Sequence, residues 1–307
     1  MNKQYVPIRL STIRPDIPLG FLLLLKVNEQ YIKYILPENS LEKSRYDNLK
    51  EKRVKKVYIL AKDEYLYQRF LDQCLSLDDQ GDVQEITRRV AGLSADSIEN
   101  IYKEPDSVHA LAHSEKAATS IINASKLNPE VLKELFQIDS EDDISISCAI
   151  CTCSTAIALA RLSKLDDEQI KNIAMASLLC DASLPRLHQN YQKFFTRNLE
   201  EFSEQEIQAY KEHPLRSAEL LQTIPNISPK VLSIIANHEE KISGKGFPKG
   251  ASKLSLEEKI VSLSNKYSLL IIGHKKPKEQ VFKDFFLNEI GSYDLELMNL
   301  LKKTMGS

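Results

Sequence analysis

The pattern of apolar and polar residues changes about a quarter of the way along the chain. In the first part, short apolar runs are mixed with segments that alternate with period two, the pattern of half-buried β-strands. Two other segments have apolar residues at helical spacing, and Ser40 stands where a helix N-cap is expected. The expected strands are residues 5–10, 20–27, 30–36 and 55–61, and the expected helices are residues 40–54 and 63–77.

From about residue 81 onward the apolar spacing is helical, and clear strand patterns do not recur. The chain is therefore expected to be α+β overall, with a small N-terminal α/β domain followed by an all-α helical bundle. The acidic stretch 139–143 is expected to be a break at which a helix begins. We expect an N-terminal domain over residues 1–80, a helical connector over 81–135 and the bundle over 136–307.

Composition limits the classes of function. The chain has 307 residues and a formal net charge of −2, so nothing indicates bulk attraction to nucleic acid or to a membrane surface. The longest apolar run, residues 20–27, is too short to span a bilayer. Five cysteines, odd in number and clustered, are a poor disulfide framework. We therefore expect a cytoplasmic protein with no membrane span.

Several residues that can bind a metal lie at predicted helix ends. One helix is expected to finish at the pair Cys180-Asp181. A later helix begins with the capping-box pattern of residues 203–206 and reaches His213, and Pro214 predicts a break or kink beside that imidazole.

The most unusual stretch is residues 236–250, ANHEEKISGKGFPKG. A helix is expected to end near His238, because Gly244, Gly246 and Pro248 predict a turn after it. Further along, Asn265 stands inside an apolar helix.

Two other groups have simpler interpretations. Cys148, Cys151 and Cys153 form a C-x-x-C-x-C pattern, but their surroundings are small and apolar, which favours a buried packing helix over a metal site. His109 and His113 share a helix face, and without a recognised carboxylate partner a solvent-side position is favoured.

The order of these residues resembles one family, the HD-GYP branch of the HD-domain metal phosphohydrolases, which hydrolyse cyclic di-GMP. The resemblance runs from Asp143 to the C-terminus and is most specific at residues 227–250 and 199–221. The N-terminal part also resembles a small domain that precedes such modules. Compared position by position, Asp181, His213 and His238 match metal ligands of the family, whereas four other ligand positions are substituted. The substituted positions are Cys148, Cys180, Asn237 and Asn265.

Other functional positions of the family are also changed. The phosphate-contacting lysine falls at Leu184, the late arginine and tyrosine fall at His274 and Lys276, and the tyrosine of Gly-Tyr-Pro is Phe247. The resemblance therefore implies that three sound ligands remain, too few for a two-metal centre. We expect no catalytic residues and no metal cofactor. The alternative is one zinc or iron ion held by Asp181, His213, His238 and Cys180.

The Gly-Phe-Pro turn is the expected partner or ligand loop. Its residues are Lys241, Gly244, Lys245, Gly246, Phe247, Pro248 and Lys249. Its lysines could contact phosphates or an acidic partner, or could simply keep the loop soluble, and its ring could stack on a guanine or pack into a partner.

The resulting hypothesis is a catalytically inactive HD-GYP-like protein in bacterial cyclic di-GMP signalling. Partners that the resemblance implies are a signalling protein such as a diguanylate cyclase domain, and the nucleotide itself. Two alternatives stay open, a residual mono-metal phosphohydrolase and a cyclic di-GMP sensor that does not hydrolyse its ligand. The apolar N-terminal strands could also pack against a second copy of the chain, which would make a homodimer.

Overall fold

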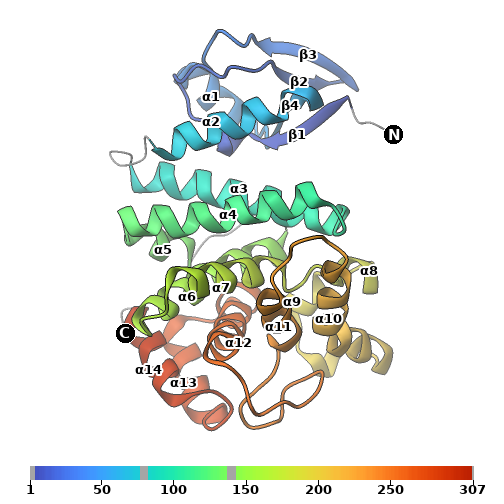
Figure 1. The fold of residues 1–307 in the computed structure, drawn as a ribbon, viewed down its shortest axis with the longest axis vertical. Coiled ribbons are helices and arrows are strands. Elements are labelled where there is room, and N and C mark those ends of the chain that lie inside the picture. The colour runs from blue at the N-terminus through green and yellow to red at the C-terminus, as the bar shows by residue number, and fades with distance from the viewer. Residues whose placement is uncertain (1–3, 77–81, 137–142, 306–307) are drawn as a thin grey trace. The chain divides into compact units, whose positions relative to one another are not determined.

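The computed structural model describes residues 4–76, 82–136 and 143–305. The chain divides into two compact units, residues 1–96 and 97–307 (Figure 1). The first unit contains a small antiparallel sheet and the second is helical, which confirms the expected fold class. The predicted boundaries at residues 80 and 135 are not the positions at which these units divide, and as domain boundaries they stay predictions.

The first unit contains four strands in the spatial order β1-β4-β2-β3, and every pair is antiparallel. Strands β2 and β3 form a hairpin whose two loop residues, Asn28 and Glu29, both have positive φ, as a two-residue hairpin turn requires. The elements are β1 (Tyr5–Arg9), η1 (Leu10–Thr12), β2 (Leu23–Val27), β3 (Gln30–Ile35), α1 (Lys43–Glu51), β4 (Lys56–Leu60), η2 (Ala61–Asp63) and α2 (Glu64–Ser76).

Apolar residues from the strands and helices of this unit form its core. Phe21 is fully buried and meets the rings of Tyr67 and Phe70 edge-on, at centroid distances of 5.7 and 5.6 Å. The predicted N-cap is wrong by two residues: Glu42 occupies the N-cap position of α1 without a side-chain capping hydrogen bond, while Ser40 forms an isolated bridge with Pro18.

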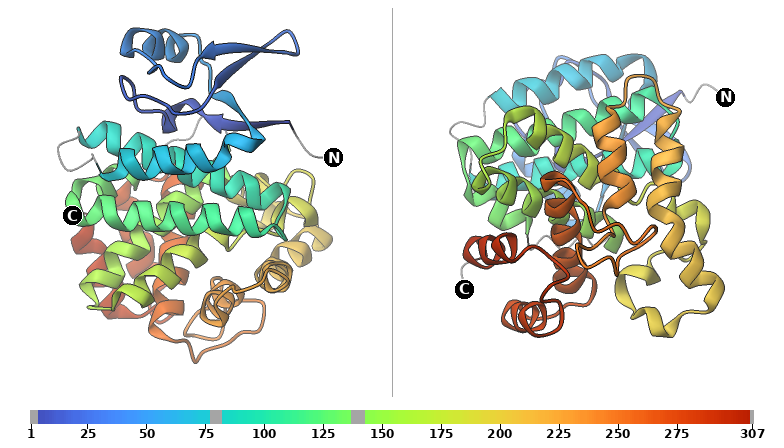
Figure 2. Two further views of the ribbon diagram at one scale, coloured as in Figure 1. Left: turned by 45° about the horizontal axis from the view of Figure 1, so that its top comes forward. Right: turned by 60° about the horizontal axis from the view of Figure 1, so that its bottom comes forward.

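The second unit is built from helices packed around α6 (Figures 1 and 2). Helix α3 (Val83–Lys103) contains the division between the units. The remaining elements are α4 (Val108–Leu127), α5 (Glu130–Leu135), α6 (Ile144–Leu162), α7 (Asp167–Leu179), α8 (Leu184–Leu187), α9 (Lys193–Thr196), η4 (Leu199–Glu201), α10 (Glu204–Gln222), α11 (Pro229–Asn237), α12 (Leu256–Ser268), the π-helix η5 (Leu269–Gly273), α13 (Lys278–Asn288) and α14 (Leu295–Thr304).

Helix α6 is the central helix of this unit and packs against α7 and α12. It is long and apolar enough to cross a membrane, but most of its residues are buried inside the unit, as in the core helix of a soluble protein. Cys148, Cys151 and Cys153 are all buried in it, which confirms the packing interpretation. Asp143 caps α6 by accepting a hydrogen bond from the Ser145 N–H, and the rest of the acidic stretch 139–143 lies outside the described residues.

One helix prediction is corrected. Helix α10 runs through Pro214 without a break. Near the C-terminus, α13 and α14 are separated by a turn in which Gly291 has φ +79°. A residue with a side chain is strained in that left-handed conformation, so the helix cannot simply continue through it.

Candidate metal centre

The three family-matching ligands come from three helices. Helix α7 ends at Leu179 and presents Cys180 and Asp181 just beyond its last turn. His213 lies in the middle of α10, and His238 is the C-cap of α11. Helices α10 and α11 lie side by side (Figure 2), which places the two imidazoles together in the interior, both fully buried.

Pro214 explains how His213 is oriented. In an uninterrupted helix the N–H of residue 214 would donate to the carbonyl of Tyr210, but proline has no N–H. The freed Tyr210 carbonyl lies 2.5 Å from Nδ1 of His213. A carbonyl can only accept a hydrogen bond, so the proton of the ring is on Nδ1 and the lone pair is on Nε2.

His238 is oriented in the same way by a helix end. Its Nδ1 lies 2.7 Å from the carbonyl of Ile235, one of the last carbonyls of α11, which also accepts a long, 3.5 Å hydrogen bond from the backbone N–H of His238. The proton is again on Nδ1, and Nε2 points into the interior. Both imidazoles therefore have the tautomer of a metal ligand.

The donor atoms converge on one point. Nε2 of His213 lies 3.0 Å from Nε2 of His238 and 3.2 Å from Oδ1 of Asp181, and Nε2 of His238 lies 3.8 Å from the same oxygen. Ligand atoms about 2.1 Å from one ion are about 3.0 Å apart in an octahedral arrangement and about 3.4 Å apart in a tetrahedral one. Two imidazole nitrogens and a carboxylate oxygen at these separations can be bridged by a proton or by a metal ion, and the donor set fits a metal ion.

Protonation of the same atoms follows this geometry. Burial alone would lower the pKa of His213, but the hydrogen bond and the charge of Asp181 outweigh it and raise that pKa. Burial and the charge of His213 lower the pKa of His238. Burial raises the pKa of Asp181, yet the two histidines hold it below its usual range.

Sequence reasoning missed Glu239 as a candidate ligand. Its carboxylate lies within 4.8 Å of donor atoms of both His213 and His238. Oε1 of Glu239 accepts hydrogen bonds from the Tyr210 hydroxyl at 2.9 Å and from Nδ2 of Asn265 at 3.0 Å. The sequence could have identified Glu239, because it directly follows His238 at a predicted helix end, where two consecutive side chains can face the same site.

Cys180 extends the donor set. Its sulfur lies 3.7 Å from Oδ2 of Asp181 and, together with His238, completes a second group of possible ligands. Burial raises the pKa of the Cys180 thiol, and the charges of Asp181 and Glu239 raise it further. The thiol therefore needs a cation beside it before it can lose its proton.

Asn237 and Asn265 both donate hydrogen bonds to glutamate side chains. Nδ2 of Asn237 donates to Oε1 of Glu258 at 2.8 Å, and the Ser233 hydroxyl donates to the same oxygen at 2.7 Å. Asn265 donates to Glu239, as described above. Each asparagine thus uses its amide N–H₂ as a hydrogen-bond donor, and the only ligand atom that it could offer a metal is a neutral amide oxygen.

Three other substituted positions are accounted for by burial or by a partner. Cys148 is buried in α6, and burial, aided by Cys151 and Asp181, raises the pKa of its thiol well above its usual value. Leu184 is fully buried in the core. Lys276 pairs with Asp284 at 2.7 Å.

The Gly-Phe-Pro loop is fixed from inside by Glu240, which is fully buried. The Glu240 carboxylate accepts hydrogen bonds from the backbone N–H groups of Lys249 and Ala251, at 2.7 and 2.8 Å. At Gly246 a Cβ atom would lie 2.4 Å from the Glu240 backbone, so only glycine fits there. The loop is therefore a packed structure.

The predicted loop residues separate into two groups. The half-buried ring of Phe247 packs inward, 5.5 Å from the ring of Tyr210 and 6.4 Å from that of His213. Lys241 is also half-buried and pairs with Glu289 at 2.7 Å. Lys245 and Lys249 are exposed. The role of this loop in binding stays a prediction.

Residues 106–283 match the model of the HD domain family. The chain is similar to the cyclic di-GMP phosphodiesterase PA4108 of Pseudomonas aeruginosa, with 23% identity over 148 residues that cover 48% of this chain and 34% of the relative. It is also similar to the cyclic di-GMP phosphodiesterase PdeB of Borreliella burgdorferi, with 29% identity over 24% of this chain and 20% of the relative. The chain thus spans about a third and a fifth of these relatives.

A solved structure resembles the whole chain. Bd1817, described as a HDG"Y"P protein from Bdellovibrio bacteriovorus, superimposes with a TM-score of 0.76 and 26% sequence identity, over 99% of this chain and 100% of that one. Proteins of this type bind metal ions, and the described residues contain two overlapping groups of possible ligands. The expectation of no metal cofactor is therefore wrong. It counted the lost ligands and missed Glu239, whereas Cys180 had been considered only for the alternative single-metal site.

Proposed function

Because the chain belongs to the HD domain family and its helical part is of the HD-GYP type, we propose that it holds one metal ion, does not hydrolyse cyclic di-GMP, and acts in cyclic di-GMP signalling by binding. One observation carries this proposal: the two asparagines at former ligand positions are committed to hydrogen bonds with Glu258 and Glu239. The donors that remain converge on a single point.

The number of donors favours one ion over two. Two metal ions about 3.5–4 Å apart need about six ligands, some of them bridging. The candidate ligands of this centre are Cys180, Asp181, His213, His238 and Glu239, and both groups of possible ligands share His238. A single ion supplies charge neutralisation and Lewis acidity when bound. The chain contributes two oriented imidazoles and two carboxylates.

The burial of the candidate ligands also supports a metal ion that does not take part in catalysis. Both histidines are fully buried, Asp181 is 6% exposed, and the rings of Tyr210 and Phe247 cover His213. Closed metal sites are typical of structural ions, whereas catalytic sites keep an open position for water or substrate. A closed single-metal centre would hold α7, α10 and α11 together and fix the base of the Gly-Phe-Pro loop.

Binding is assigned to the outer surface of that loop. Lys245 and Lys249 are exposed and lie on either side of Phe247, and they suit an acidic protein surface or a phosphate group. The occupants we propose are a signalling protein such as a diguanylate cyclase domain, or cyclic di-GMP itself, in the cytoplasm. A homodimer through the N-terminal part is compatible with this arrangement.

Incubation of the purified chain with cyclic di-GMP and Mn²⁺, Fe²⁺ or Zn²⁺, followed by chromatography, tests the proposal. We expect no linear dinucleotide and no GMP above the level in buffer. A Lys245→Glu variant, compared with Lys253→Glu as a control at another exposed lysine, tests the loop. Binding that Lys245→Glu weakens and Lys253→Glu preserves supports it. Hydrolysis of cyclic di-GMP by the native chain that is lost in the Asp181→Asn variant would contradict the proposal that the protein is inactive.

A residual mono-metal phosphohydrolase is the second candidate, favoured by the convergence of Asp181, His213, His238 and Glu239. A single ion can still activate water on a simple phosphodiester. Assays with bis(p-nitrophenyl) phosphate separate the two candidates. Metal-dependent release of nitrophenol that His238→Ala abolishes selects the enzyme, and its absence selects the binding protein.

A further inference from the structure

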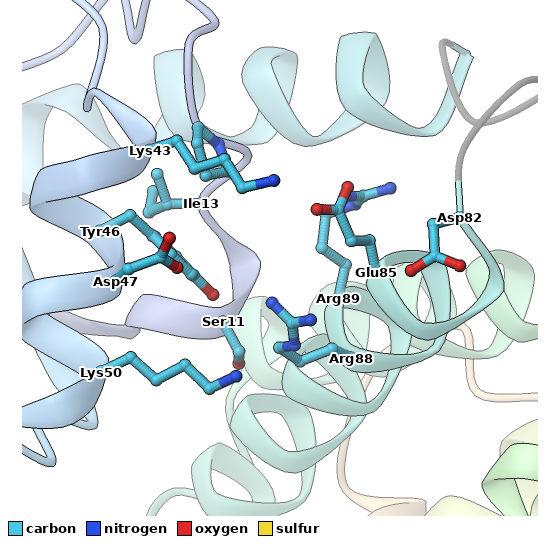
Figure 3. Close-up of a pocket in the computed structure, with 11 residues that line it drawn as sticks. Ser11, Ile13, Lys43, Tyr46, Asp47, Lys50, Asp82, Glu85, Arg88 and Arg89 are labelled. Carbon is cyan, nitrogen blue, oxygen red and sulfur yellow. The ribbon is translucent and has the colours of Figure 1, made fainter.

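A cavity of about 170 Å³ lies within the N-terminal unit, and none of the residues that line it is a candidate metal ligand (Figure 3). One wall is a stripe of α1 with helical spacing, Lys43, Tyr46, Asp47 and Lys50. The opposite wall is the start of α3, and the floor is the segment around η1. The lining residues from the floor and from α3 are Ser11, Ile13, Pro15, Asp82, Glu85, Arg88 and Arg89.

Cationic side chains without ionic partners extend into this cavity. Lys43 and Lys50 are exposed and Arg88 is half-buried, and none of the three forms an ion pair within the described parts of the chain. Figure 3 shows that the side-chain ends of Lys50, Arg88 and Ser11 gather at one end of the cavity. Unpaired cations that converge on one hollow are available for an anion.

Tyr46 is the second, independent observation. The residue is 4% exposed, yet within the described residues its hydroxyl makes no hydrogen bond. The hydroxyl points into the cavity, toward the same space as Arg88 (Figure 3). The hydroxyl is the solvent-accessible end of an otherwise buried side chain, so it is held in place and available to donate a hydrogen bond to a ligand in the cavity.

From these contacts we propose that the N-terminal unit contains a binding site for a phosphate group, held by Arg88, Lys50 and the hydroxyls of Tyr46 and Ser11. Arginine suits the fork geometry of an oxyanion, and lysine adds a point charge. The cavity is smaller than the roughly 300–1,000 Å³ of sites for drug-sized ligands, so it fits inorganic phosphate or the phosphate end of a small phosphomonoester.

The acidic lining residues limit the affinity and set the orientation. Asp47, Asp82 and Glu85 also face the cavity, but in Figure 3 their carboxylates lie away from the end where Lys50 and Ser11 meet. Asp47 is one helical turn from both Lys43 and Lys50. Its negative charge opposes an oxyanion, so Asp47→Asn is expected to strengthen phosphate binding.

The test is isothermal titration of the full chain, stripped of metal by a chelator so that phosphate cannot bind at the metal centre. The probes are inorganic phosphate and glycerol 3-phosphate in separate arms. Two or three charge-assisted hydrogen bonds correspond to a Kd of about 1 mM or below. Tighter binding of the ester identifies a phosphorylated small molecule as the ligand class, and equal or tighter binding of phosphate identifies the free anion.

Matched variants locate the binding. Lys50→Gln and Tyr46→Phe should weaken the affinity about tenfold or more, and Arg88→Gln should do at least as much. Lys52→Gln, an exposed lysine at the end of the same helix and outside the cavity, is the control and should change nothing. If Arg88→Gln does not fold, Lys50→Gln carries the test alone. No heat with either probe, or equal losses in Lys50→Gln and Lys52→Gln, would overturn the site.

Discussion

At the scale of single residues, the centre depends on which atom of each side chain can accept or donate. His213 and His238 have their Nδ1 protons fixed by backbone carbonyls, so their Nε2 lone pairs face each other across 3.0 Å. Asn265, by contrast, uses its amide as a donor to Glu239. Together with the Tyr210 hydroxyl, that amide satisfies Oε1 of Glu239 by hydrogen bonds.

Replacing this asparagine with aspartate should make folding depend on metal. Asn265→Asp removes the donor to Glu239 Oε1 and places two carboxylates side by side. We expect the metal-free variant to lose about 1–3 kcal/mol of unfolding free energy, and divalent metal to restore most of it. Urea unfolding with and without Mn²⁺ measures this. The control is Asn48→Asp, the same change at an exposed helical position. A metal-free Asn265→Asp as stable as the native chain would refute the role given to Asn265.

At the scale of helices, positions where the backbone ladder is interrupted orient the ligands. Pro214 removes the N–H that would donate to the Tyr210 carbonyl in the middle of α10. At the end of α11 the Ile235 carbonyl accepts a long, 3.5 Å backbone hydrogen bond, from the His238 N–H. His213 and His238 use these two carbonyls. The proline predicted to break α10 is tolerated inside it because a histidine proton takes the place of the missing backbone N–H.

Pro214→Ala should change metal affinity and folding stability in opposite directions, weakening metal binding while stabilising the metal-free chain. The new N–H donates to the Tyr210 carbonyl and competes with Nδ1 of His213. Alanine is about 3 kcal/mol more favourable than proline inside a helix, and the lost packing of two buried methylenes is about 1.6 kcal/mol, so the metal-free variant should gain about 1 kcal/mol. Metal affinity should fall about 10- to 100-fold. Chelator competition and thermal unfolding check both. Unchanged affinity would show that the free carbonyl does not orient His213.

Glu258 connects two helices and gives a pH-dependent prediction. Its carboxylate accepts hydrogen bonds from Ser233 and Asn237 on α11 and from the Ser255 N–H at the start of α12. Burial raises the pKa of Glu258, but these hydrogen bonds outweigh it and lower the pKa below its ordinary 4.5. Its stabilisation is therefore fully present above that pH and is lost as the pH falls through the lower folded-state pKa.

Glu258→Gln should lower the unfolding free energy by about 1–3 kcal/mol at pH 7, because the amide cannot accept all three hydrogen bonds. The difference from the native chain should narrow when the pH falls below 4.5. Denaturant unfolding at pH 7, 5 and 4 measures it. Glu168→Gln, at an exposed acid in the first turn of α7, serves as the control. A constant difference at all three pH values would argue against an ionised Glu258 as the connecting group.

At the scale of the whole molecule, regular periodicity predicted most of the fold. Short apolar runs and alternation with period two located the four strands of the first unit, and helical spacing located the long helices. Family spacing also located Asp181, His213 and His238, which meet as expected. What spacing could not predict was the contribution of side chains without a motif. Glu239 becomes a candidate ligand only because α11 ends at Asn237, and the phosphate site joins Ser11, Tyr46 and Arg88 from three separate segments.

The central claim is that the substitutions at Asn237 and Asn265 leave a centre for one metal ion. The most direct test is elemental analysis of the purified full chain after expression with added manganese, iron and zinc. We predict about one transition-metal ion per chain, removed in His238→Ala and retained in the control His109→Ala, whose histidine is exposed on α4. Two ions per chain, or none under any of these conditions, would contradict the account.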